Sequence, residues 1–298
     1  MVLPSHLARF LSIAQLLVAI TATGVIASAA DRRSGPIIRW DLTSPPLSRH
    51  ARDLPNELTP SPLHGPQFGN TPPHALIFTS NQQQVTTRLT NEQTASLPKT
   101  ALSLEVWVRP EENKKRFGLI SCKGEKQIGW ILGGNADHFF FTLASEKKER
   151  STQLIARPFY QTGQWYLITA TYDGQRQKLY VDGHLAGEAF EQRENILPLS
   201  SPKILLGVLP PQNDDKTTPT FFSGQLGSVR IWDRALTATE IKSRFGAEQA
   251  NFPGALAVYD STRDWPTFGH DNHRSGRAGA EPRLPLHLAW HRKILPAP

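Results

Sequence analysis

The segment from Gly163 to Gly183 alternates apolar side chains with the period of two that is typical of β-strands. It predicts one strand over residues 165–172 and a second strand that ends at Val181. Asp173-Gly174 supplies the turn between them, because glycine adopts the positive φ that other residues resist. Both faces of this hairpin carry apolar residues, which indicates a position inside a layered β-structure.

The segment LSLEVWVRP at residues 102–110 also alternates. One face carries Leu102, Leu104, Val106 and Val108, and the other carries Glu105, Trp107 and Arg109. Pro110 ends the strand, because proline has no N–H to donate to a neighbouring strand. The pattern predicts a half-buried strand on which Glu105 stands alone and faces solvent.

Short apolar segments bounded by Gly, Pro, Asn or Lys predict most of the remaining strands. These are residues 37–42, 75–78, 119–122, 127–132, 138–143, 152–156 and 203–208. One helix is predicted over residues 236–245, where Thr237 and Glu240 have the T-x-x-E spacing of a capping box. Many short strands at this spacing are typical of a sandwich of two sheets.

Two motifs in this pattern resemble a known family. One is the hairpin segment, GQWYLITATYDGQRQKLYVDG, and the other is FFSGQLGSVRIWDRALTATEI at residues 221–241. Together they resemble the laminin-G-like jelly roll of the concanavalin A-like superfamily, over residues 36–246. The matching residues, in chain order, are Trp165, Tyr172, Asp173, Gly174, Leu179, Tyr180, Val181, Asp182, Gly183, Gly224, Leu226, Val229, Arg230, Ile231, Arg234, Ala235, Leu236 and Thr237. The resemblance implies an all-β fold: an antiparallel two-sheet jelly-roll sandwich with one short C-terminal helix.

The alternation and the family's strand placement predict one core cluster between the two sheets. Its expected members are Trp165, Tyr172, Leu179, Val181, Val229 and Ile231.

The first thirty residues predict a secretory signal peptide. His6 and Arg9 precede an apolar run over residues 11–26, and Ala27-Ser28-Ala29 offers the small residues that signal peptidase accepts. A retained anchor is the alternative, but polar residues interrupt the run, which makes it a poor permanent span. We expect no stable membrane insertion, a mature chain that starts near Ala30 or Asp31, and a secreted or periplasmic (extracytoplasmic) location.

Two further segments differ from the strand pattern. Residues 45–73 are rich in Pro, His, Ser and Asn and predict a long loop inside a domain of residues 31–246; the alternative is a linker that leaves residues 37–42 outside the fold. Residues 247–298 are expected to be a linker and a truncated propeller start. Within them, Trp265, Pro266, Phe268, Asp271, Ser275, Gly276, Leu286, Leu288 and Trp290 resemble the first segment of pyrroloquinoline-quinone-type β-propellers, and a disordered tail is the alternative.

Composition narrows the function classes. The formal net charge is +7, but the basic residues are scattered and form no stripe with aromatic residues, so we expect no nucleic-acid partner. The single cysteine, Cys122, excludes an intramolecular disulfide and is interpreted as a small buried hydrophobe. Stability must then come from packing.

The sequence offers no catalytic constellation. Jelly-roll glycosidases commonly carry Glu-x-Asp-x-x-Glu on one strand, so that alternate carboxylates share a face, and this string is absent. There is no Gly-x-Ser-x-Gly, no His-Glu-x-x-His and no phosphate-binding glycine loop. Histidines occur mostly in predicted loops, as at His50, His64, His74, His184, His270 and His273. We therefore expect no enzyme activity in this chain.

Calcium is the one cofactor that the sequence leaves open. Asn135 and Asp137, and Asp214 and Asp215, place carboxylate and amide oxygens in two predicted loops, and a hard cation needs several such oxygens. The alternative is that they are turn residues. Members of the family frequently carry Ile-Asp-Glu before the closing Val-Arg-Ile, but this chain has Leu-Gly-Ser there, at residues 226–228. An acidic site of the kind found in the family is therefore not expected.

These observations favour a non-catalytic recognition module of an exported protein, which binds a glycan or a cell-surface or other extracellular protein through loops at one edge of the sandwich. The alternative is a structural domain that docks against an adjacent propeller whose activity, including any enzyme activity, lies beyond residue 298. An exposed aromatic platform would favour the first hypothesis, and a large apolar patch near Phe245 the second.

Overall fold

The computed structural model describes residues 35–43, 58–60, 66–69, 72–79, 82–112, 116–125, 127–157, 159–211 and 218–253. The chain divides into two units, Met1–Gly35 and Pro36–Pro298, and every strand and helix given below belongs to the second unit. The expected signal peptide and the expected propeller segment lie outside the described residues. No helix in the described part of the chain is long and apolar enough to cross a membrane.

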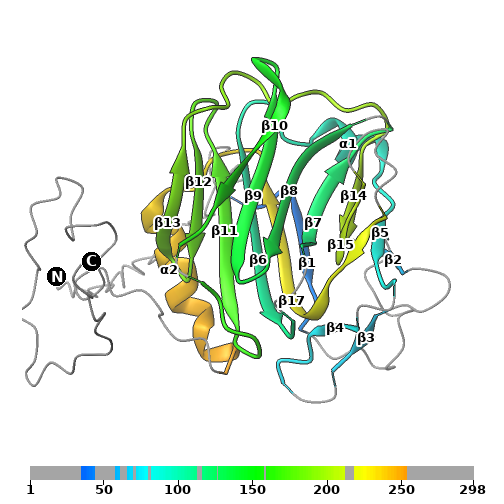
Figure 1. Ribbon diagram of the computed structural model, residues 1–298, viewed down its shortest axis with the longest axis vertical. Helices are drawn as coiled ribbons and strands as arrows, with labels where there is room; N and C mark the ends of the chain where they lie inside the picture. The colour runs from blue at the N-terminus through cyan, green and yellow to red at the C-terminus, as the bar shows by residue number, and fades with distance from the viewer. Residues whose placement is uncertain are drawn as a thin grey trace, which may run out of the picture. The chain divides into compact units, whose positions relative to one another are not determined.

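Two antiparallel β-sheets form a jelly-roll sandwich (Figure 1). The eight-stranded sheet has the order β13-β12-β11-β6-β17-β4-β3, and β4 and β1 pair with successive parts of β17. Its strands are β1 (Ile38–Asp41), β3 (Gln67–Phe68), β4 (Leu76–Thr79), β6 (Leu102–Pro110), β11 (Tyr166–Tyr172), β12 (Gln177–Val181), β13 (His184–Ala189) and β17 (Ser223–Trp232).

The seven-stranded sheet has the order β10-β9-β8-β7-β14-β5-β2. Its strands are β2 (Leu58–Pro60), β5 (Val85–Thr87), β7 (Phe117–Lys123), β8 (Ile128–Asn135), β9 (His138–Ser145), β10 (Lys148–Ile155) and β14 (Lys203–Leu206). A separate two-stranded sheet consists of β15 (Val208–Leu209) and β16 (Thr220–Phe221).

The predicted hairpin is confirmed. Strands β11 and β12 pair from Ile168 opposite Val181 to Tyr172 opposite Gln177. Gly174 in the connecting turn has a φ of 87°, which glycine adopts without the steric cost of a Cβ.

The segment over residues 45–73 is only partly as expected. It contains β2 and β3, which pair with β5 and β4. Strands of two or three residues are too short to show a period in the sequence, so the loop prediction was wrong at these places. The linker alternative is also wrong for residues 37–42, because β1 pairs with β17 inside the larger sheet.

The main core lies between the two sheets and contains five of the six predicted residues: Tyr172, Leu179, Val181, Val229 and Ile231. The sixth prediction was wrong. Trp165 belongs to a separate cluster with Trp107, Leu167, Phe245 and Phe252, on the opposite face of the eight-stranded sheet. The period of two explains this, since Trp165 is one residue out of phase with the inward-facing Tyr166.

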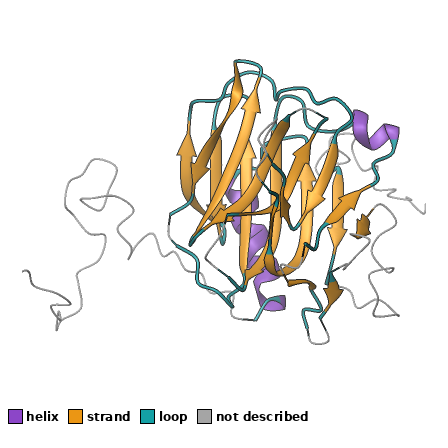
Figure 2. Ribbon diagram, turned by 45° about the vertical axis from the view of Figure 1, so that its right-hand side comes forward, coloured by secondary structure: helices purple, strands orange, loops and turns teal. Residues whose placement is uncertain are grey.

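Strand β6 is buried on both faces, not half-buried as predicted. The cause is the helix α2 (Ala238–Glu248), which covers the outer face of the eight-stranded sheet (Figure 2). Thr237 and Glu240 form the predicted capping box, with the Glu240 N–H donating to Thr237 Oγ1 over 3.2 Å. The pKa of Glu240 is lowered to about 2, mainly because its carboxylate accepts hydrogen bonds from Arg234. Hydrogen bonds from Thr237 lower the pKa in the same direction.

The expected domain end at residue 246 lies inside α2, so that boundary was wrong. The chain continues through the 3₁₀ turn η3 (Gln249–Asn251) to Phe252, which is buried. Its ring stacks on Trp107 with centroids 4.0 Å apart.

A second, shorter helix, α1 (Asn91–Ala95), was not predicted. Thr90 and Gln93 form a capping box there as well, with the same three-residue spacing.

Candidate functional site

A cavity of about 430 Å³ lies at the end of the sandwich where the turns β7–β8, β9–β10 and β11–β12 are found; we call it the end pocket. Its walls come from two loops, one that leads from α1 to β6 and one between β13 and β14. The lining residues are Thr94, Leu97, Pro98, Lys99, Thr100, Cys122, Trp130, Glu146, Asn195, Ile196, Leu197, Pro198, Leu199 and Pro202.

Cys122 and Trp130 are the buried sheet residues of the end pocket. They lie directly opposite each other on β7 and β8, and both belong to the core between the sheets. Burial raises the pKa of the Cys122 thiol to about 12, so the thiol stays protonated at neutral pH and does not act as a nucleophile. The prediction that Cys122 is a small buried hydrophobe is confirmed.

The wall over residues 194–202, which we call the strap, is fixed by backbone hydrogen bonds on both sides. The N–H of Ile196 donates to Lys99 O over 2.7 Å, and the N–H of Leu197 donates to Ala144 O over 3.0 Å. Asn195 holds the strap further, because its side-chain amide donates to Glu146 Oε2 over 2.9 Å. The pocket is therefore largely preformed.

A buried glutamine anchors the approach to the strap. Gln192 is completely buried, and its Oε1 accepts hydrogen bonds from the N–H and the hydroxyl of Ser145 over 3.0 and 2.7 Å. Its Nε2 donates to Arg150 O over 3.0 Å. Satisfied buried amides of this kind fix a loop in one place.

The polar groups of the end pocket do not form a catalytic set. Thr94 is half-buried, and Lys99, Thr100, Glu146 and Asn195 are exposed. Glu146 is the one carboxylate among the described lining residues. Most glycoside hydrolases use two carboxylates that flank the scissile bond, and the described lining residues supply one.

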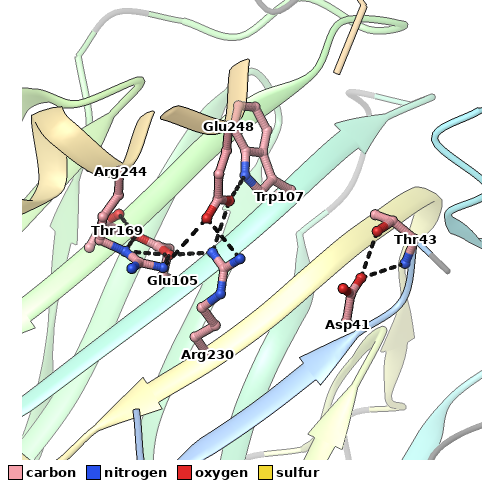
Figure 3. A network of polar contacts seen from close by, with 8 residues as sticks. All are labelled: Asp41, Thr43, Glu105, Trp107, Thr169, Arg230, Arg244 and Glu248. Carbon is pink, nitrogen blue, oxygen red and sulfur yellow. Dashed lines mark hydrogen bonds and ion pairs between the residues drawn. The ribbon is translucent and has the colours of Figure 1, made fainter. Parts of the chain in front are cut away.

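A charged network lies on the other side of the eight-stranded sheet, under α2 (Figure 3). The Glu105 carboxylate is fully buried, which corrects the prediction that Glu105 faces solvent. Arg230 Nη1 donates to Glu105 Oε1 over 2.8 Å, and Arg244 Nη2 donates to the same oxygen over 2.7 Å. The Nε of Arg244 donates to both carboxylate oxygens over 3.1 Å.

Glu248 closes this network at the last residue of α2. Its carboxylate accepts from Arg230 over 2.9 and 3.0 Å and from the indole N–H of Trp107 over 2.8 Å. The network thus ties α2 to strands β6 and β17. A general acid or base must reach its substrate within hydrogen-bond distance, so the buried Glu105 has a structural role.

The structure describes two of the four calcium candidates. Asp214 and Asp215 lie outside the described residues. Asn135 is exposed at the end of β8, and the Asp137 carboxylate lies 2.5 Å from His138 Nδ1. Ala136 between them has a φ of 55°, the conformation of a tight turn, which supports the turn interpretation. No group of three His, Cys, Asp or Glu suited to a metal occurs in the described part of the chain.

Among the described residues, two large aromatic rings are exposed, and they lie in separate loops. Phe159 is 61% exposed and meets the His138 ring edge-on, with centroids 4.4 Å apart. Phe190 is 53% exposed, and the Arg176 guanidinium lies 5.7 Å from the centre of its ring. A large apolar patch near Phe245 would favour the docking hypothesis, but Phe245 itself is buried.

Sequence reasoning missed the end pocket altogether. Only a weak signal existed: Pro98, Pro198 and Pro202 mark loops on either side of it. The two loops lie about 100 residues apart, and no local pattern shows that they meet.

Comparison with known proteins agrees with this architecture. A family model described as the concanavalin A-like lectin/glucanases superfamily matches residues 79–242, more than half of the chain. The chain is 29% identical over 242 residues to pappalysin-1 of Mus musculus, and 29% identical over 245 residues to pappalysin-1 of Homo sapiens. Each match covers 74% of this chain but only 14% of the relative.

Solved structures share the fold at low identity. The binding domain of botulinum neurotoxin serotype D/C has a TM-score of 0.54 at 15% identity, over 72% of this chain and 52% of that one. A second structure concerns the cell entry of botulinum neurotoxin type C, which is described as dependent on interaction with two ganglioside molecules. Its TM-score is 0.53 at 15% identity, over 74% of this chain and 53% of that one. At this identity the likeness concerns the fold.

Proposed function

Because the chain belongs to the concanavalin A-like lectin/glucanases superfamily, we propose that it is a non-catalytic recognition module of an exported protein, which binds a glycan or an extracellular protein partner. The observation that carries this proposal is the end pocket: a preformed cavity with an apolar interior and a polar rim, built by loops at one end of a rigid sandwich. Ligand sites of proteins have this composition and volume, about 300–1,000 Å³.

Two further observations support a binding role. The fold is shared with receptor-binding domains of botulinum neurotoxins, one of which is described with gangliosides. Glu105, a fully buried acidic residue of the eight-stranded sheet, is held by Arg230 and Arg244 and does not line the pocket. Recognition without catalysis is the function that fits both.

The setting of this module is proposed from sequence alone. We infer from residues 1–30 that the chain is exported, and from residues 264–298 that a propeller-like domain continues the protein. In that setting an adjacent propeller would be a partner within the same protein. Calcium at Asn135 and Asp137 would be a separate feature, at the end of the sandwich opposite the end pocket.

A pair of matched variants tests the binding site. Thr94→Trp places an indole at the wall of the end pocket, whereas Ala95→Trp places it on the next residue of α1, which is exposed and does not line the pocket. Helix α1 has no buried residues, so both variants should fold. The full chain is applied to an array of glycans and extracellular matrix proteins.

We expect every captured ligand to bind Thr94→Trp at least about tenfold more weakly than wild type, which corresponds to roughly 1.4 kcal/mol, and to bind Ala95→Trp unchanged. Equal binding by both variants would remove the end pocket from the proposal. Release of shorter sugars from any glycan on the array would contradict a non-catalytic role.

A further inference from the structure

We propose that the end pocket takes a single apolar side chain, aromatic or branched aliphatic, presented by a partner protein. This inference rests on the proposed function and narrows its ligand class from glycan or protein to a protein with an exposed apolar anchor.

The interior of the end pocket is chemically apolar. Apart from Cys122 and Trp130 it is walled by aliphatic residues and prolines: Leu97, Pro98, Ile196, Leu197, Pro198, Leu199 and Pro202. Three of these are prolines, which offer no backbone N–H to a ligand. The protonated thiol of Cys122 adds a small, weakly polar surface.

Several backbone and side-chain groups of the strap are already used by the fold. The N–H groups of Ile196 and Leu197 donate to Lys99 O and Ala144 O. Pro198 O accepts from the Gln127 side chain over 3.0 Å. The amide of Asn195 is engaged by the carboxylate of Glu146.

A bare sugar ring fits such walls poorly. Its hydroxyl groups would leave water and meet walls with few free donors and acceptors, at a cost of about 1–3 kcal/mol for each unpaired group. An apolar side chain has no such groups and gains from the area it removes from water. The chemistry of the walls therefore selects the apolar ligand.

The rim indicates a protein as the source of that side chain. Lys99 and Glu146 lie on opposite sides of the strap, since Ile196 pairs with Lys99 on one side and with Ser145 on the other. A rim with a cation and an anion around an apolar centre complements the polar flanks of a peptide, as at protein–protein anchor pockets. It offers no net positive charge to an anionic lipid surface.

The test uses small probes and methyl NMR of the full chain. The probes are N-acetyl-tryptophanamide and N-acetyl-leucinamide. N-acetyl-glycinamide, which has the same backbone groups but no side chain, is the matched negative control. N-acetylglucosamine and methyl galactoside represent sugars, and octanoate represents an acyl chain. The reporters are the methyl resonances of Leu97, Ile196 and Leu199 in the pocket, with Leu185 on β13 as a remote control.

We expect the two apolar amides to shift the pocket methyls in a saturable way, while the glycine amide and the sugars leave them unchanged. Thr94→Trp, and independently Thr100→Trp at the exposed rim, should weaken these shifts at least about tenfold. Ala95→Trp should preserve them.

Three results would overturn the inference. Sugars that shift the pocket methyls as strongly as the amides would refute the apolar side chain but leave the proposed recognition function standing. Octanoate that binds in place of the amides would show a lipid site. No saturable shift with any probe would refute both the inference and the end pocket as the binding site.

Discussion

Asp182 is a completely buried carboxylate in the turn between β12 and β13. One oxygen accepts from the N–H of Leu167 over 2.8 Å, and the other has no hydrogen-bond partner among the described residues. Burial raises the pKa of Asp182 from 3.8 to about 7, although the bond from Leu167 partly opposes the shift. This side chain therefore couples folding to pH.

Because the folded pKa lies above the unfolded value, the folded state binds more protons between these two values. The stability that Asp182 contributes is complete below its unfolded pKa of 3.8 and is lost as pH rises through about 7. Asp182→Asn keeps an acceptor for Leu167 and removes the charge. Over this pH window, we expect the unfolding free energy of the wild type to fall by on the order of 2–4 kcal/mol more than that of the variant.

Urea denaturation at several pH values measures this difference. Asp173→Asn, in the exposed turn of the neighbouring hairpin, is the matched control and should keep the wild-type pH dependence. A pH dependence that persists unchanged in Asp182→Asn would show that another group is responsible.

Single residues also show where sequence reasoning fails. Alternation placed Glu105 on the opposite face from the core residues of its strand, which is correct, but gave no sign that α2 covers that face. Arg230 and Arg244, which neutralise Glu105, lie 125 and 139 positions away. A pattern within one strand cannot show partners at that distance, and the same limit hid the end pocket.

At the scale of elements, local rules predicted several elements, but α1 was missed although Thr90 and Gln93 give it a capping box. The hairpin of β11 and β12 follows from alternation and an Asp-Gly turn, and the start of α2 follows from its capping box. The end of α2 was missed, because the helix is held there by tertiary contacts of Glu248 and not by a C-terminal cap in the sequence. Helix stability in proteins depends more on packing than on propensity.

The segment after α2 should stabilise the sandwich through one side chain. Phe252 stacks on Trp107 and packs against Trp165, with ring centroids 5.0 Å apart in the second pair. Gly227 makes room for it, since a Cβ at that position would come within 2.4 Å of the Phe252 ring. We expect a chain that ends at Glu248 to lose about 3 kcal/mol of unfolding free energy, as for the truncation of a buried Phe.

A chain that ends at Pro253 is the control, because it keeps Phe252 and removes only residues 254–298. Its melting temperature should stay close to that of the full chain. Equal melting temperatures for both truncated chains would show that the Phe252 contact contributes little.

At the scale of the whole molecule, two packed sheets supply stability without a covalent link. The one cysteine of the 298 residues is buried and cannot form an intramolecular disulfide. The core between the sheets forms one layer, and the aromatic cluster and the Glu105 network together form a second layer between the eight-stranded sheet and α2. The family resemblance predicted the overall arrangement, while the end pocket is built by two loops whose meeting no local pattern shows.

The last prediction concerns the route of the chain out of the cell. The charged start, the apolar run over residues 11–26 and Ala27-Ser28-Ala29 predict cleavage by signal peptidase, with a mature chain that begins near Ala30 or Asp31. Intact-mass spectrometry of the exported protein should show this start. The double variant Ala29→Tyr, Ala30→Tyr would place a bulky residue directly before each of the two expected cleavage bonds and should leave the precursor uncleaved. Arg32→Ala changes a residue beyond these bonds, and this variant should be processed normally. Exported protein that retains Met1 would instead establish the first thirty residues as an anchor.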